Sequence, residues 1–304
     1  MNLNNISNLI ELFIKQFENQ KDKQSILLSS LKDKNINFSW EKTFKAIYIL
    51  SEEIKKYINK GDRCLLVSEN RPEWFISDLS IMSSGSITVP AYTTYAEKDY
   101  EYIINDCSPS IVFVSNDEQF KKIKKIIKNK SFIKKIFSFE KLSELEKDDY
   151  ININDLFSKS IEINNNFYID INRKDPACII YTSGTQGNPK GVVLSHGGIL
   201  NNCEGAIEIL KPLIKKKHTR FLTWLPLSHS YEHTVQFVQI TVSARIFYAE
   251  SIDRLIKNMN DCRPEIMTAV PRFYQNLYQK INSSFNKSTG IKKELIKRMI
   301  KLGL

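Results

Sequence analysis

The sequence has 304 residues, and its 42% hydrophobic and 11% aromatic content is enough for one large domain or two ordinary ones. This composition excludes wholesale disorder and coiled-coil or collagen-like chains. The five cysteines are odd in number, widely spaced and without a CxxC pair, which excludes a disulfide scaffold or a zinc framework. The formal charge is +10, but only nine of the 44 basic residues are arginine, so we expect no nucleic-acid partner.

Helical and strand patterns alternate along the first half of the chain. Apolar spacing predicts helices over residues 9–17 and 40–57. Gly61-Asp62 ends the second helix, residues 64–67 form a short buried strand, and Pro72 opens the next helix, where its missing N–H does no harm. The alternation then continues with a strand at 87–89, a helix at 97–106, a strand at 111–114, a helix at 117–129 and a strand at 133–139.

The second half continues this order after a polar, Asn-rich stretch. Residues 140–172 are predicted to be a surface excursion, and Ala177–Tyr181 is a clear buried strand. Further elements are predicted as a helix at 197–211, strands near Phe221 and Ile246 with a helix between them, a strand at 265–270 and a helix at 272–282. Short apolar strands alternating with helices favour an α/β fold, in which helices pack on mostly parallel sheets.

Glycines gather directly after the strand that ends at Tyr181. Five of the ten glycines fall within fifteen residues, namely Gly184, Gly187, Gly191, Gly197 and Gly198. Residues 181–191 read Tyr-Thr-Ser-Gly-Thr-Gln-Gly-Asn-Pro-Lys-Gly, which combines glycines, hydroxyl donors and the positive charge of Lys190. Such a loop points successive N–H groups at an anion and suits a di- or triphosphate. It is not a Walker A loop, because Lys190 stands between Pro and Gly, and its glycines at 184, 187 and 191 do not have the GxGxxG spacing.

Residues 181–191 resemble the phosphate loop of the adenylate-forming (AMP-binding) enzymes, which include acyl-CoA synthetases, firefly luciferase and the adenylation domains of peptide synthetases. That loop usually has Thr where this chain has Gln186, which can still donate a hydrogen bond to a phosphate. Three further stretches narrow the resemblance to long-chain fatty-acid–CoA ligases: Gly-Asp-Arg through Ser-Glu-Asn-Arg-Pro-Glu-Trp at 61–74, Leu-Pro-Leu-Ser-His-Ser-Tyr-Glu at 225–232 and Ala-Val-Pro-Arg-Phe-Tyr at 269–274.

The resemblance implies a reaction and a set of site residues. In this family a carboxylate attacks the α-phosphate of ATP, pyrophosphate leaves, and the thiol of coenzyme A then attacks the acyl-adenylate. The implied ligase uses a fatty acid, ATP and coenzyme A with Mg²⁺, for which Thr182 is a ligand. His229 is implied as a catalytic contact to the carboxylate or α-phosphate, with a packed histidine near a helix start as the alternative. The residues implied around the β- and γ-phosphates are Ser183, Gly184, Thr185, Gln186, Gly187 and Lys190, and Thr182 is implied beside them as a cofactor-binding residue through Mg²⁺.

The resemblance also bears on domain organisation. The family's large domain carries YGxTE and TGD motifs, which have no match up to Leu304. We therefore expect residues 1–304 to be an incomplete AMP-binding large domain, without the small C-terminal domain, from a fragment or a truncated gene. Two alternatives stay open: an adenylate-forming ligase for an aryl acid, an amino acid or an acyl carrier protein, and a non-catalytic remnant.

The remaining signals concern location and single residues. The amino terminus lacks the features of a signal peptide, and the charge-free residues 79–96 are too polar for a membrane helix, so we expect a soluble cytoplasmic protein. Residues 121–135 are a lysine run that predicts a solvated helix face, with peripheral membrane contact as the alternative. His196 is expected to pack at a helix start, and Trp224 and Phe237 to be core residues or the lining of an acyl tunnel.

Overall fold

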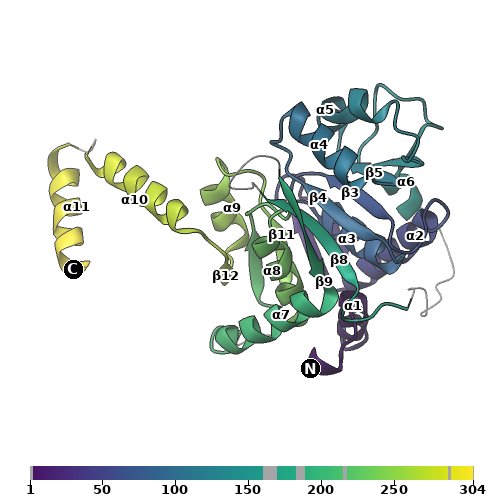
Figure 1. The fold of residues 1–304 in the computed structure, drawn as a ribbon. Helices are drawn as coiled ribbons and strands as arrows, with labels where there is room; N and C mark the ends of the chain where they lie inside the picture. Colours follow the sequence, from purple (N-terminus) through teal and green to yellow (C-terminus); the bar gives the residue numbers. More distant parts are fainter. Residues whose placement is uncertain (1–2, 160–169, 183–188, 215–217, 287–288, 304) are drawn as a thin grey trace. The chain divides into compact units, whose positions relative to one another are not determined.

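The fold is that of a computed structural model, which describes residues 3–159, 170–182, 189–214, 218–286 and 289–303 (Figure 1). The chain divides into two compact units, Met1–Met267 and Thr268–Leu304. The first unit contains two sheets with helices on both faces of the larger one, so the predicted α/β fold is confirmed.

The larger sheet has seven strands and is parallel except at one edge. Its order is β7 (Tyr150–Asn152), β6 (Lys135–Ser138), β5 (Ile111–Val114), β3 (Arg63–Val67), β4 (Ile87–Ala91), β8 (Pro176–Thr182) and β9 (Lys190–Ser195). The central strands are continuous apolar runs because both faces are covered. In β3, for example, Cys64 and Leu66 face one core while Leu65 and Val67 face the other.

The smaller sheet has five strands and gathers segments from both ends of the first unit. Its order is β12 (Ile266–Met267), β10 (Arg220–Thr223), β11 (Arg245–Tyr248), β1 (Ile26–Ser30) and β2 (Asn37–Ser39). Only the β1–β2 pair is antiparallel. The sequence analysis did not predict β1 and β2, because β1 is held by a parallel partner, β11, that lies far away in the chain.

The helices form two groups around the larger sheet. Helices α4 (Glu97–Cys107) and α5 (Asp117–Ile127) cover one face, as Figure 1 shows. The other face carries the main core, to which the smaller sheet and the remaining helices of the first unit contribute: α1 (Leu9–Glu18), α2 (Trp40–Ile54), α3 (Pro72–Ser83), α6 (Ile153–Phe157), α7 (His196–Leu210) and α8 (Ser230–Thr241). The short helices η1 (Leu3–Asn5) and α9 (Leu255–Cys262) complete the unit. The predicted position of Pro72 at the start of a helix is confirmed.

Helix α3 is buried along its whole length. Two of its buried serines satisfy their hydroxyl groups within the helix. Ser80 and Ser83 donate to the carbonyls of Ile76 and Leu79, each at 2.7 Å. Back-bonding of this kind lets a polar sequence form a core helix. The helix lies between the two sheets and contacts strands of both.

Two predictions require correction. Residues 140–172, expected to be a polar excursion, contain β7 and α6. The apolar residues Ile153 and Leu156 of α6 are buried. The predicted strand at 265–270 is reduced to the two residues of β12.

Phe237 is a core residue, with its ring 6.0 Å from that of Phe75.

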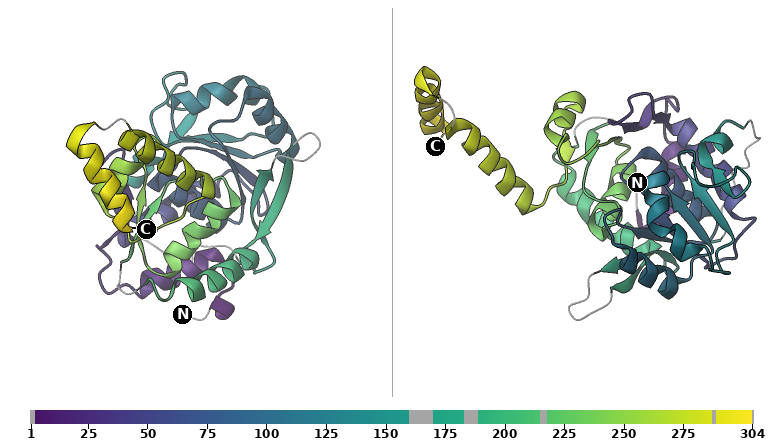
Figure 2. Two further views of the ribbon diagram at one scale, coloured as in Figure 1. Left: turned by 90° about the vertical axis from the view of Figure 1, so that its left-hand side faces the viewer. Right: turned by 90° about the horizontal axis from the view of Figure 1, so that it is seen from above.

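The second unit consists of α10 (Pro271–Asn286) and α11 (Gly290–Gly303). None of the helices in the described part of the chain is long and apolar enough to cross a membrane. Figure 2 shows the first unit from two further sides.

Two glycines of α7 provide a matched test of the packing. A Cβ at Gly197 would lie 2.9 Å from the carbonyl oxygen of Arg173, whereas a Cβ at Gly205 would meet nothing within 4 Å. We expect Gly197→Ala to lower the free energy of unfolding by about 1–3 kcal/mol, because backbone must move. Gly205→Ala, the control, should raise it by about 0.5–1 kcal/mol. Chemical denaturation measures both, and equal effects would contradict this packing.

Candidate active site

The predicted phosphate loop connects the two strands of a β-hairpin. Strands β8 and β9 are antiparallel, and their register pairs Thr182 with Lys190. Both residues are exposed. A hydroxyl group and an ammonium group therefore stand on neighbouring strands at the base of the loop. The other predicted phosphate contacts, Ser183, Gly184, Thr185, Gln186 and Gly187, lie outside the described residues.

The first and last residues of the loop motif have a packing role. The hydroxyl group of Tyr181 donates to Asp106 at 2.5 Å, which ties β8 to α4. Across the hairpin, a Cβ at Gly191 would lie 2.9 Å from Cγ2 of Ile179 and 3.2 Å from Cζ of Tyr181. Glycine at 191 thus leaves space for the tyrosine ring, and the two residues together fix the base of the loop.

A cleft of about 260 Å³ lies at the carboxyl ends of four strands, β3 and β4 of the larger sheet and β10 and β11 of the smaller sheet. Its lining comes from the segments that follow β3, β4, β10 and β11, namely residues 68–70, 92–94, 224–228 and 249–252. Ligands of parallel sheets bind at the carboxyl ends of the strands, because the loops that follow the strands converge there. Since Thr88 pairs in parallel with Cys178, Thr182 at the end of β8 belongs to the same edge.

Asn70 holds the segment that precedes His229. Its Nδ2 donates to the carbonyl of Leu225 at 2.6 Å, and its Oδ1 accepts from the N–H of Leu227 at 3.0 Å. The side-chain amide thus replaces a strand partner for backbone that would otherwise lack one. The Ser-Glu-Asn-Arg-Pro-Glu-Trp stretch and the Leu-Pro-Leu-Ser-His stretch are therefore two sides of one contact.

The residues next to Asn70 form a charged cluster that anchors this turn. Nε and Nη2 of Arg71 donate to the carboxylate of Glu73, each at 3.0 Å, and its Nη1 donates to Glu140 at 2.7 Å. Burial lowers the pKa of Arg71, but these carboxylates outweigh burial and raise it above its ordinary value. Glu69 accepts from the hydroxyl of Ser115 at 2.6 Å. The sequence analysis quoted these residues only as a motif and assigned them no role.

His229 is the N-cap of α8. Its Nδ1 accepts from the N–H of Tyr231 at 3.2 Å, so the neutral ring carries its proton on Nε2. The side chain is exposed rather than packed, and it stands at the positive end of a twelve-residue helix. This position suits a contact with an anion. Ser228 next to it lines the cleft.

His233, one turn further along α8, is fully buried and was assigned no role from sequence. Its Nε2 lies 2.8 Å from Oδ2 of Asp78 on α3, and its ring meets the edge of Trp74 with centroids 5.3 Å apart. Burial lowers the pKa of His233, but Asp78 outweighs burial and raises it well above its ordinary value. This buried ion pair joins α3 to α8.

His196 packs at the start of α7, as expected. It is 1% exposed, and its Nδ1 accepts from the N–H of Leu9 at 3.4 Å. Burial lowers its pKa to about 4, so the ring is neutral near pH 7. His196 therefore belongs to the core and not to the site.

A metal ion at this site would depend on its ligand. In the described ranges, no three or more His, Cys, Asp or Glu side chains are grouped so that they could hold a metal. Magnesium, however, commonly takes few protein ligands and completes its shell with water and phosphate oxygens. The exposed hydroxyl of Thr182 fits one position in such a shell.

Comparison with known proteins assigns the chain to a family. Residues 13–299 match the AMP-binding enzyme family, and the chain belongs to that family. The resemblance predicted from residues 181–191 is therefore confirmed.

Particular relatives are acyl-CoA synthetases. The chain is 30% identical to fatty acyl-CoA synthetase A of Dictyostelium discoideum over 78% of this chain and 36% of that protein. It is 28% identical to long chain acyl-CoA synthetase 3 of Arabidopsis thaliana, over 78% and 37%, and 27% identical to human long-chain-fatty-acid–CoA ligase 1, over 84% and 38%. The chain thus spans less than two-fifths of the length of these relatives.

Solved structures show the same fold. ATP-bound MatB from Rhodopseudomonas palustris superposes with a TM-score of 0.71 at 22% identity, over 90% of this chain and 51% of that chain. The luciferase-like enzyme of the Zophobas morio mealworm gives a TM-score of 0.74 at 16% identity, over 90% and 61%.

The contact made by Asn70 can be tested directly. We expect Asn70→Ala to lower the free energy of unfolding by about 1–3 kcal/mol, because it leaves the backbone of residues 225–227 without partners. Amide hydrogen exchange of residues 225–229 should quicken at the same time. Asn35→Ala, in an exposed turn, is the control and should change stability by less than about 0.5 kcal/mol. Unchanged exchange in Asn70→Ala would contradict the contact.

The His233–Asp78 pair predicts a dependence of stability on pH. The folded pKa of His233 lies above the value of about 6.5 expected in the unfolded chain, so its contribution is full below about pH 6.5. That contribution is lost as the pH rises through the folded pKa. Denaturation at a series of pH values above 6.5 should show falling stability, with a smaller slope in Asp78→Asn. Equal slopes would contradict a charged pair.

Proposed function

We propose that this chain carries the triphosphate-binding part of a long-chain fatty-acid–CoA ligase. In the reaction, a fatty acid attacks the α-phosphate of ATP to form an acyl-adenylate and release pyrophosphate, and the acyl group then passes to coenzyme A with release of AMP. One observation carries the proposal: the base of the predicted phosphate loop and the segment that bears His229 follow parallel strands, at the carboxyl edges that also form the cleft. The acyl-CoA synthetase relatives support this class of substrate.

The first step needs compensation of negative charge. The carboxylate and the triphosphate repel each other, and the leaving pyrophosphate gains charge. In this proposal, Lys190 and the loop N–H groups bind the β- and γ-phosphates, so that donors are already in place where charge develops. His229 donates from Nε2 to a carboxylate or α-phosphate oxygen, assisted by the N-terminus of α8.

Magnesium, when bound, would neutralise phosphate charge. Thr182 is proposed as its ligand from this chain, together with phosphate oxygens. Asn70 keeps the backbone of residues 225–227 in place and thereby orients His229. The Thr182–Lys190 pairing holds the ligand and the cation on adjacent strands.

The proposal extends to the organisation of the protein. Residues 1–304 are proposed to be the amino-terminal part of the large adenylation domain. The protein is proposed to work in the cytoplasm, with peripheral contact to a membrane that holds its substrate.

Replacing Lys190 tests the proposed reaction. With ATP, coenzyme A and palmitate, the protein expressed from its own gene should form AMP, and Lys190→Ala should lower the rate on the order of 100-fold, because a preorganised cation is lost. Lys174→Ala, just before the opposite end of β8, is the matched control and should keep the rate. A panel from acetate to palmitate to benzoate identifies the acid. The absence of AMP with every acid would refute the ligase, and a preference for benzoate would refute the fatty acid.

A further inference from the structure

A second cleft lies in the first unit, lined by residues that do not line the first one. It has a volume of about 580 Å³ and is formed by α5, the segment that leads to β6, the start of β6 and residues 144–149. Five of its lining side chains are apolar: Phe120, Ile127, Ile133, Ile136 and Leu145. Phe120 and Ile127 are buried and the other three are half-buried, so the cleft has an apolar floor.

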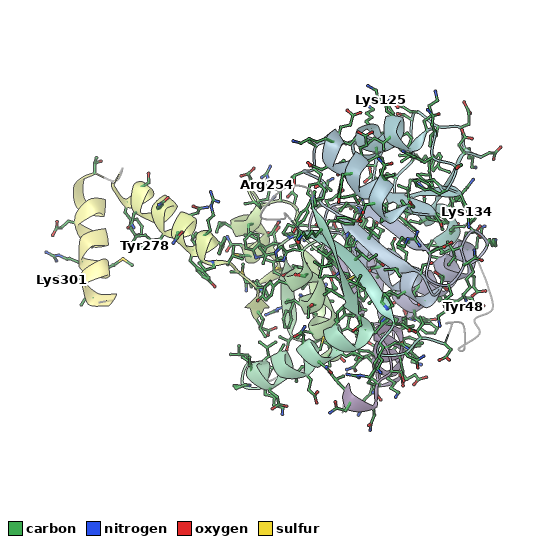
Figure 3. The ribbon with its side chains drawn as sticks, in the orientation of Figure 1. Tyr48, Lys125, Lys134, Arg254, Tyr278 and Lys301 are labelled. Atoms are coloured by element: carbon green, nitrogen blue, oxygen red, sulfur yellow. The ribbon has the colours of Figure 1, made fainter. Side chains whose placement is uncertain are left out.

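The rim of this cleft is cationic. Two carboxylates, Glu144 and Asp149, also line it. The basic residues of the rim are Lys124, Lys125, Lys128, Lys130, Lys134 and Lys135. Figure 3 shows Lys125 and Lys134 extending outward from the ribbon. We name this feature the lysine cleft.

Most of this positive charge is not compensated within the protein. Lys124 pairs with Glu144, and Lys134 lies 3.6 Å from Asp62. Lys130 and Lys135 donate to neutral oxygens, those of the Asn105 side chain at 2.6 Å and the Asp148 backbone at 2.8 Å. Within the described ranges, the exposed Lys125 and Lys128 have no carboxylate partner.

Two lysines on other helices, α1 and α2, are paired with carboxylates. Lys15 lies 2.6 Å from Glu11, and Lys45 lies 2.7 Å from Glu41. These lysines pair with a glutamate one turn away and form an ordinary solvated helix face. The lysine cleft instead places Lys125 and Lys128, which have no carboxylate partner in the described ranges, beside half-buried apolar side chains.

The chemistry of the lysine cleft selects among anionic partners. Nucleic-acid surfaces rely on arginine and on stacking aromatic side chains, but the lining has no arginine and its one aromatic residue is buried. A small free anion would make no favourable contact with an apolar floor. The surface of a bilayer offers both anionic headgroups and adjoining hydrocarbon. Helix α5 itself cannot insert, because Phe120, Ile123 and Ile127 pack on the sheet.

We propose that the lysine cleft docks the protein on an anionic lipid bilayer. Lys125 and Lys128 contact the headgroups, and the apolar floor receives the adjoining part of one lipid. The proposal assigns a surface to the peripheral membrane contact of the proposed function. It rests on that part of the proposed function and on no other part. Its test involves no catalysis, so its failure and the failure of the ligase proposal are distinguishable.

Vesicle sedimentation tests the docking surface. The chain should bind vesicles of phosphatidylcholine with phosphatidylglycerol and not vesicles of phosphatidylcholine alone, and high salt should weaken the binding. Lys125→Glu/Lys128→Glu should lower the partition at least about tenfold. Lys125→Arg/Lys128→Arg should keep it, because both charges remain.

A second charge-reversed variant controls for net charge. Lys32→Glu/Lys257→Glu changes the formal charge by the same amount at exposed lysines outside the cleft, and it should bind like the unaltered chain. Unchanged unfolding midpoints would show that all variants are folded. Equal loss of binding in both charge-reversed variants would overturn the proposal, as would equal binding to neutral vesicles. Selective loss of polynucleotide binding in the cleft variant, with vesicle binding kept, would also overturn it.

Discussion

The buried position of α3 between the two sheets is the constraint on which the candidate site depends. All twelve of its residues are buried, and the helix contacts strands of both sheets. Asn70, just before the helix, holds residues 225–227, while Asp78 within it holds His233 on α8. One helix therefore sets the relative position of the two carboxyl edges that form the site cleft. A local shift of α3 would move both edges at once.

This arrangement places ionic and polar groups in a core. Removing one member of a buried pair such as Asp78–His233 leaves a charge without compensation and typically costs about 3–5 kcal/mol. A well-packed apolar pair of similar size could be as stable, so the ion pair adds direction rather than strength. The 2.8 Å contact fixes the rotation of α8, and with it the direction in which its N-cap, His229, points.

The sequence allowed the prediction of features that depend on neighbouring residues. Pro72 identified the start of α3, and the glycines and hydroxyl residues after Tyr181 indicated the AMP-binding family. Features that depend on distant partners could not be predicted. The pairing of β1 with β11 and that of Asp78 with His233 each join segments far apart in the chain. His229 and His233 lie one turn apart, and nothing local in the sequence tells which one is exposed. The roles of Thr182, Lys190 and His229 stay predictions.

The lysines of this chain differ in what surrounds them, and that difference matters more than their number. Lys190 pairs with Thr182 across neighbouring strands at the base of the predicted phosphate loop, and both residues are exposed. Lys125 and Lys128 stand beside half-buried isoleucine and leucine side chains. A polyphosphate satisfies the first environment, because it offers several acceptors to converging donors. Only an anion with attached hydrocarbon satisfies the second, since water is excluded from its apolar floor at the same time as charge is neutralised. An enzyme that takes a long-chain acid from a bilayer would need both kinds of surface, one for its nucleotide and one for the source of its substrate.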